Sequence, residues 1–163
     1  MVSSPRASVA SVLLLLASFG ARGEATSIVI GTGQLGMRKE IRHSLGIDVQ
    51  VRSAWRWHVI RPVAGVLTSS KGGAYVYSGV VADIPLAGTF QLTPGFAPGI
   101  VLASGNRDLG SPIEFRSSLE VSFVPFEPLR FGIALSHVSN GRLGQHNPGV
   151  ETLTFNVSIP VRR

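Results

Sequence analysis

Apolar and polar residues alternate along much of this 163-residue chain. From Ile41 to Arg52 every second side chain is apolar except His43, and the positions between them are polar or glycine. Side chains of a β-strand point to opposite faces in turn, so this pattern predicts a strand with one apolar face. The same pattern returns in four further segments, residues 90–102, 113–123, 131–135 and 153–161.

Two other segments, residues 55–67 and 74–85, are strand-like in their Trp, Tyr and Val content but alternate poorly. A short piece at residues 27–32 brings the expected total to eight strands, an even number that lets an antiparallel sheet close into a barrel. The aromatic residues of the poorly alternating segments fit either an aromatic belt at a membrane interface or ordinary core packing. They are Trp55, Trp57, Tyr75 and Tyr77.

Each clearly alternating segment has one apolar face and an opposite face that is polar, charged or very small. An apolar exterior around a polar interior is typical of a transmembrane β-barrel. A soluble exported β-barrel or sandwich also alternates and is the alternative. We therefore predict an all-β fold, an eight-stranded antiparallel transmembrane β-barrel of the bacterial outer membrane.

The first 23 residues have the pattern of a secretory signal peptide. Arg6 precedes an apolar stretch from Val9 to Phe19, and Ala21-Arg22-Gly23 supplies small residues before a cleavage site. An uncleaved anchor helix is the alternative, but about 11 apolar residues are fewer than the ~20 that a membrane-spanning helix needs. We assign residues 1–23 to the signal peptide and residues 24–163 to one β-barrel domain.

The lengths of the connections indicate which end of the barrel faces outward, because bacterial barrels have short periplasmic turns and longer outer loops. Short connections are expected at residues 52–55, 85–88 and 125–128. The connections between them are expected to be the outer loops, at residues 32–40, 68–73, 103–112 and 139–150.

Charge and cysteine content restrict the partners. The chain has no cysteine and no residue spacing that suggests a metal site, so we expect neither a disulfide nor a metal. The formal charge of +6 falls to +4 without Arg6 and Arg22, which suits an anionic partner. The basic residues are scattered and the chain is exported, so we exclude nucleic acid and favour the anionic surface of a bacterial envelope.

Three residues with hydrolytic chemistry lie at outward positions near the outer ends of the last two strands. His137 and Ser139 are at the next alternate positions after the apolar Phe131, Ile133 and Leu135, so they are expected on the same outward face. Glu151 is the first of the outward-facing positions of the last strand. Histidine can take the proton of a serine hydroxyl, and a carboxylate behind the imidazole fixes its tautomer. We expect the hairpin to bring all three together on one external patch, although His-x-Ser alone is a weak signal.

The complete run around these residues is more specific. Ser136-His137-Val138-Ser139-Asn140, then Asn147-Pro148-Gly149 and Glu151, resembles the motif of the PagL family of outer-membrane lipid A 3-O-deacylases. The resemblance implies a serine esterase without a cofactor. It makes Ser139 the nucleophile, His137 the base and Glu151 the orienting carboxylate. It also implies an oxyanion role for Asn147 and a site-shaping role for Asn140.

The same resemblance implies that residues 24–163 hydrolyse the ester-linked 3-hydroxyacyl chain at the 3-position of lipid A, with the site toward the outer leaflet. The implied partners are lipopolysaccharide and outer-membrane lipids, and a homodimer stays open. Arg142 and Arg107 are candidates to contact lipid A phosphates, with solvated loop charge as the alternative. The alternative functions are a non-catalytic barrel of the OmpA or OmpX type, with an envelope or adhesion role, and a soluble exported lipid carrier.

Overall fold

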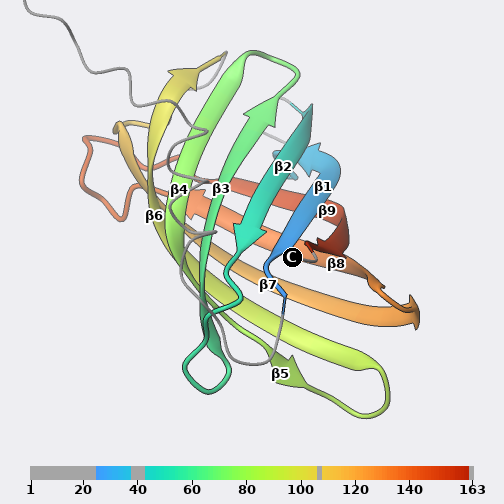
Figure 1. The fold of residues 1–163 in the computed structure, drawn as a ribbon. Coiled ribbons are helices and arrows are strands. Elements are labelled where there is room, and N and C mark those ends of the chain that lie inside the picture. The colour runs from blue at the N-terminus through green and yellow to red at the C-terminus, as the bar shows by residue number, and fades with distance from the viewer. Residues whose placement is uncertain (1–24, 38–42, 106–107, 162–163) are drawn as a thin grey trace, which may run out of the picture.

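A computed structural model describes residues 25–37, 43–105 and 108–161, which form an antiparallel barrel (Figure 1). No described segment is a helix long and apolar enough to cross a membrane. The predicted signal peptide and Arg107 lie outside the described residues. The strands are β1 (Ser27–Leu35), β2 (Ser44–Arg52), β3 (Ile60–Ser69), β4 (Gly73–Ala82), β5 (Ile84–Pro85), β6 (Phe90–Ser104), β7 (Ile113–Phe126), β8 (Leu129–Ser139) and β9 (Val150–Pro160).

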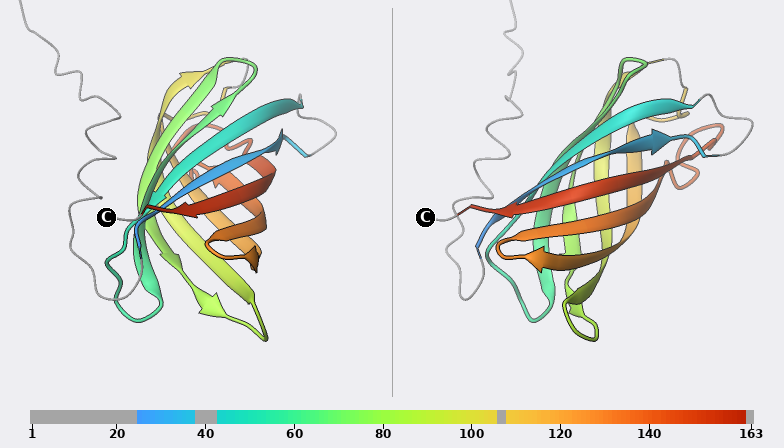
Figure 2. Two further views of the ribbon diagram at one scale, coloured as in Figure 1. Left: turned by 45° about the vertical axis from the view of Figure 1, so that its right-hand side comes forward. Right: turned by 90° about the vertical axis from the view of Figure 1, so that its right-hand side faces the viewer.

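The sheet closes on itself because the first and last strands pair. β1 and β9 run antiparallel, with Ser27 opposite Pro160 and Leu35 opposite Thr152. β4 pairs with β6, and the two-residue β5 pairs with Leu92 and Gln91 of β6 on the same side as β4. The barrel therefore has eight principal strands, as predicted, and Figure 2 shows them wrapping around one axis.

The two faces of the strands differ as the alternation predicts. On β2 the outward Leu45 and Ile47 are 68% and 54% exposed, whereas the inward Asp48 is 1% exposed. The inward residues of β7 and β9 are likewise polar and buried, including Glu120 and Asn156. Apolar side chains thus cover the outside of the barrel. The interior contains many buried polar side chains and one buried hydrophobic cluster: Leu35, Leu67, Tyr75, Tyr77, Ala97, Val138 and Val150.

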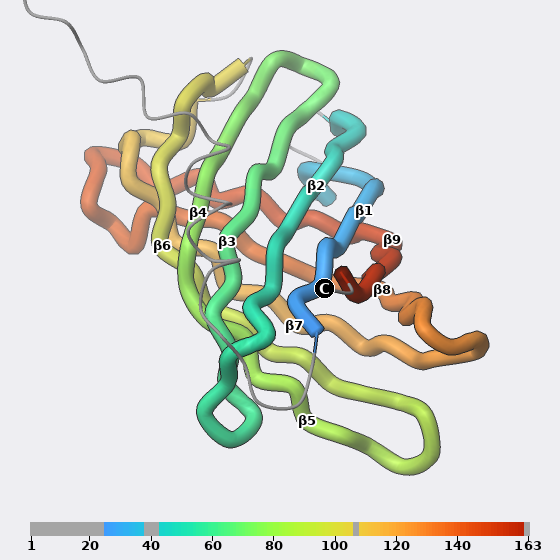
Figure 3. The backbone as a smooth tube through the Cα atoms, viewed as in Figure 1, coloured from blue at the N-terminus to red at the C-terminus, as the bar shows by residue number. Residues whose placement is uncertain are grey.

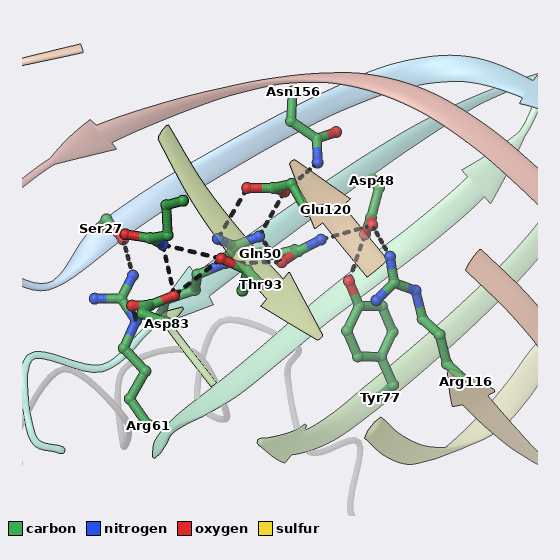
Figure 4. Close-up of polar contacts among 12 residues, drawn as sticks. Ser27, Asp48, Gln50, Arg61, Tyr77, Asp83, Thr93, Arg116, Glu120 and Asn156 are labelled. Carbon is green, nitrogen blue, oxygen red and sulfur yellow. Dashed lines mark hydrogen bonds and ion pairs between the residues drawn. The ribbon is translucent and has the colours of Figure 1, made fainter. Parts of the chain in front are cut away.

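Ion pairs link opposite walls of this interior (Figure 4). Arg52 on β2 donates two hydrogen bonds to Glu120 on β7, at 2.8 and 3.2 Å, and Asn156 Nδ2 donates to the same carboxylate at 2.6 Å. Arg116 forms a second pair with Asp48 at 3.0 Å. Buried charges are tolerated when each is paired and hydrogen-bonded, so these groups fix the strands at one relative position.

The variant Glu120→Leu is expected to lower the free energy of unfolding by about 3 to 5 kcal/mol, because it leaves the buried Arg52 without its carboxylate. The double variant Arg52→Met/Glu120→Leu should recover most of that loss, since no unpaired charge remains. Urea unfolding of the refolded barrel in detergent micelles measures both. A single variant as stable as the parent protein would show that the pair does not hold the walls together.

The structure shows which of the four aromatic residues Trp55, Trp57, Tyr75 and Tyr77 belong to the core and which are exposed. Tyr75 and Tyr77 lie inside the barrel, 5% and 1% exposed, where the Tyr77 hydroxyl donates to Asp48 at 2.6 Å. Trp55 and Trp57 lie in the connection between β2 and β3 and are 46% and 64% exposed. The two tyrosines are therefore core residues, and of the four aromatic residues only the exposed tryptophans remain candidates for an interfacial belt.

Two predicted connections were wrong in length. β3 begins at Ile60 and not near Trp55, because Trp57 and Ile60 exchange backbone hydrogen bonds around a tight turn in which His58 has φ of 57°. The connection of residues 53–59 is thus longer than expected. The predicted outer loop at residues 68–73 is reduced to residues 70–72, since strand pairing continues to Ser69 and resumes at Gly73. Figure 3 traces both connections.

Candidate active site

The hairpin of β8 and β9 positions the candidate catalytic residues. Leu135, His137 and Ser139 lie on the outward face of β8, and between them Ser136 and Val138 are buried inside the barrel. The loop of residues 140–149 joins the two strands at the end where residues 70–72 and 105–112 also connect strands. The polar residues therefore stand at one mouth of the barrel, where its apolar outer surface ends.

His137 and Glu151 are direct partners across the two strands. Their Cα atoms are opposite one another in the register, and His137 Nδ1 lies 3.5 Å from Glu151 Oε1. The side chains are 44% and 20% exposed, so the pair is accessible from outside. Because the carboxylate faces Nδ1, the imidazole is oriented with Nε2 pointing away from Glu151, as a triad requires of its base.

Ser139 lies two residues beyond His137 on the same face of β8. Two residues of an extended strand span about 7 Å, so the two side chains are neighbours on the surface. No hydrogen bond joins these two described residues in the structure. Such bonds are commonly long before substrate binds. The structure thus brings the three predicted residues onto one patch, with the His–Glu contact formed.

Gly149 packs against the imidazole, a contact that the sequence did not reveal. A Cβ atom built there would lie 2.7 Å from His137 Cε1 and 3.3 Å from Nε2, and the backbone φ is +61°. Both the close approach and the left-handed backbone require glycine. The only sequence feature that pointed to this packing contact was the position of Gly149, directly after Pro148 and two residues before Glu151.

Asn140 organises the loop from within. It is 0% exposed, its Nδ2 donates to the carbonyls of Leu109 and His146 at 2.9 and 2.8 Å, and its Oδ1 accepts from the Arg142 amide at 2.9 Å. Because Nδ2 is already committed to two carbonyls, Asn140 has no side-chain donor left for a substrate. The geometry favours the site-shaping role predicted for it.

Asn147 is oriented by its neighbour. The backbone amide of Asn140 donates to Asn147 Oδ1 at 3.1 Å, and the Asn147 side chain is exposed. With the oxygen held in this way, the Nδ2 group carries the free donors of the amide. An exposed pair of donors beside the Ser139 end of β8 is what an oxyanion site needs.

Residues 108–112 lie against the site loop and support it. Asp108 Oδ2 is 3.2 Å from His146 Nε2, and a Cβ atom on Gly144 would lie 2.1 Å from the Gly110 carbonyl. Arg142 is exposed at φ of 68°, and no contact of it with the triad is seen among the described residues. It is available to a ligand outside the barrel.

Comparisons with known proteins agree with this picture. A family model described as Lipid A 3-O-deacylase (PagL) matches residues 43–160, a range that contains all the site residues named above. No curated protein matches the chain significantly.

Solved structures share the fold at low sequence identity. The crystal structure of the outer membrane enzyme PagL has a TM-score of 0.64 at 17% identity, covering 83% of this chain and 99% of that one. The crystal structure of Neisserial surface protein A (NspA) has a TM-score of 0.63 at 10% identity, with coverages of 87% and 99%. A de novo designed transmembrane β-barrel gives 0.58 at 9% identity, with coverages of 87% and 100%. Such likenesses establish a small transmembrane barrel.

Proposed function

Because this chain belongs to the lipid A 3-O-deacylase (PagL) family of the bacterial outer membrane, we propose that it removes the ester-linked 3-hydroxyacyl chain from the 3-position of lipid A. The observation that carries the proposal is the outward His137–Glu151 pair, 3.5 Å apart, with Ser139 next on the same face of β8. Lipid A is an outer-leaflet lipid, so an enzyme on the barrel exterior meets its ester without extracting the substrate from the membrane.

The first half of the reaction forms an acyl-enzyme. His137 Nε2 takes the proton of the Ser139 hydroxyl as its oxygen attacks the ester carbonyl. Glu151 holds the imidazole and stabilises its charged form. The tetrahedral intermediate then expels the sugar 3-oxygen, which receives the proton from His137. The product is deacylated lipid A, and the acyl chain stays on Ser139.

Water completes the reaction. His137 takes a proton from a water molecule that attacks the acyl-enzyme, and then returns the proton to Ser139 as the 3-hydroxy fatty acid leaves. In both halves Asn147 Nδ2 donates to the developing oxyanion, a contribution typically worth about 10²- to 10³-fold in rate. Arg142 contacts a lipid A phosphate, for which guanidinium is well suited.

Mass spectrometry of lipid A tests the reaction. Lipid A in detergent is incubated with the folded barrel or with a heat-unfolded sample of the same protein. The folded protein alone is expected to remove one 3-hydroxyacyl chain, which fragmentation of the product assigns to the 3-position. An unchanged spectrum with a folded barrel would instead favour a non-catalytic barrel of the OmpA or OmpX type.

The variant Gly149→Ala is expected to lower the rate of lipid A deacylation by about 100-fold, because its Cβ displaces the imidazole of His137 and a small misplacement of a catalytic group costs that much. Gly88→Ala is the matched control. Gly88 has a similar φ of +68° but no atom within 4 Å of its Cβ position, so this variant carries the backbone strain without the clash. Equal losses in both variants would assign the effect to backbone strain.

A further inference from the structure

A polar cavity of about 250 Å³ lies at the mouth of the barrel opposite the candidate active site. Its lining includes the start of β1, the start of β8 and the end of β9, the strand ends that lie away from the loop of residues 140–149. When the active site faces the outer leaflet, this mouth faces the periplasm. One water molecule occupies about 30 Å³ in the liquid, so the cavity has room for a molecule as large as an amino acid.

Two of the three arginines that line the cavity are already paired (Figure 4). Arg61 Nε lies 3.0 Å from Asp83 Oδ2, and Arg61 Nη2 donates to the Ser27 hydroxyl at 3.0 Å. Arg52 Nη2 lies 2.8 Å from Glu120 Oε2. These side chains are buried, so their charges are neutralised within the barrel wall and form a fixed, polar lining for a ligand.

The other two charged groups of the lining are Arg130 and Glu127. Among the described residues, the side chain of neither has a hydrogen bond or an ion pair, with the other or with any other group. Glu127 lies in the turn between β7 and β8, and Arg130 is the second residue of β8. Three residues span at most about 10 Å, so both side chains can contact one small molecule. The cavity therefore presents one unpaired positive and one unpaired negative charge.

We infer that this cavity binds an α-amino acid group, whose carboxylate contacts Arg130 and whose ammonium contacts Glu127. A guanidinium can donate two parallel hydrogen bonds to a carboxylate. A simple anion would gain the contact with Arg130 but be repelled by Glu127, and a simple cation would meet the reverse. Only a ligand with both charges gains both contacts, so the site discriminates by charge pattern. The inference does not depend on the deacylase function.

Three probes of similar size separate the two charges. Alanine carries both, propionate lacks the ammonium and ethylamine lacks the carboxylate. Isothermal titration calorimetry measures the Kd of each with the folded barrel in detergent micelles. The parent protein is expected to bind alanine about tenfold more tightly than either of the other probes, because each of these loses one charge-assisted contact.

Two variants assign the contacts. Arg130→Gln is expected to weaken alanine binding about tenfold, since the carboxylate loses its charged partner. Glu127→Gln should weaken alanine binding to a similar extent and tighten propionate binding, because the repulsion of the anion is removed. Lys71→Gln is the matched control: it removes a positive charge from the exposed connection of residues 70–72 at the other mouth, and should leave all three affinities unchanged.

Parent protein that binds propionate as tightly as alanine, or alanine binding that Arg130→Gln leaves unchanged, would overturn the inference. So would a folded parent protein that binds no alanine, since the cavity would then hold water only. Heat-dependent gel mobility checks the folding of every variant.

In the periplasm, free amino acids and cell-wall peptides both carry the α-amino acid group. A soluble cell-wall peptide with a free α-amino acid end on its diamino acid distinguishes these sources. Tighter binding of the peptide than of alanine would identify the cell wall, and equal binding would identify free amino acids.

Discussion

Replacing Ser139 by alanine is expected to lower the rate of lipid A deacylation by about 10⁴- to 10⁶-fold, because no nucleophile remains to form the acyl-enzyme. The release of 3-hydroxy fatty acid, quantified by mass spectrometry over a long incubation, measures this loss. The barrel should stay as stable as the parent protein, since the half-buried Ser139 hydroxyl is hydrogen-bonded to none of the described residues.

Ser136→Ala is the matched control for that variant. Ser136 lies on the same strand but faces the interior, where its hydroxyl is 2.6 Å from Thr152 Oγ1. Its loss should weaken the hairpin slightly and leave most of the activity. A Ser139→Ala protein that kept a substantial part of the parent rate would remove Ser139 as the nucleophile and keep the enzyme.

The variant His137→Ala is expected to lose activity to the same extent as Ser139→Ala, because the hydroxyl is a poor nucleophile without its base. The double variant should be no slower than either single variant, since the two residues act as one unit. Rates of fatty acid release from all three proteins form the test. Losses that multiply in the double variant would mean that His137 and Ser139 act independently.

Most of the barrel could be predicted from sequence because its two faces meet different solvents. Ile47 and Asp48 are adjacent in the chain, yet the first faces outward and the second is buried among ion pairs. A period of two that persists over ten residues has no other simple explanation. The facing of β2, β6, β7, β8 and β9 is accordingly as predicted.

The sequence was least informative where alternation failed. The sequence around Tyr77 did not show which face its side chain occupies. Its hydroxyl can be buried because it donates a hydrogen bond to Asp48 on another strand. The lengths of the connections at residues 53–59 and 70–72 depend on how far strand pairing continues. The extent of pairing follows from the register of the neighbouring strands. Neither is a local property of the chain.

The candidate site divides in the same way. The proximity of His137 and Glu151 was predictable. The alternation of side chains places both on the outward face, and the hairpin makes their strands neighbours. The support that Gly149 gives to the imidazole and the complete bonding of Asn140 depend on the path of the loop. The path of a loop follows from its tertiary contacts, here those with residues 108–110, and the short-range sequence pattern does not encode it.

We propose that Ser139 is a nucleophile activated by His137 on the outer surface of the barrel. A fluorophosphonate probe reacts with serines activated in this way, and peptide mass spectrometry locates the modified residue. We expect a label on Ser139 in the folded parent protein and none in the His137→Ala variant. A label on another residue, equal labelling of both proteins, or no label on a parent barrel that deacylates lipid A would contradict it.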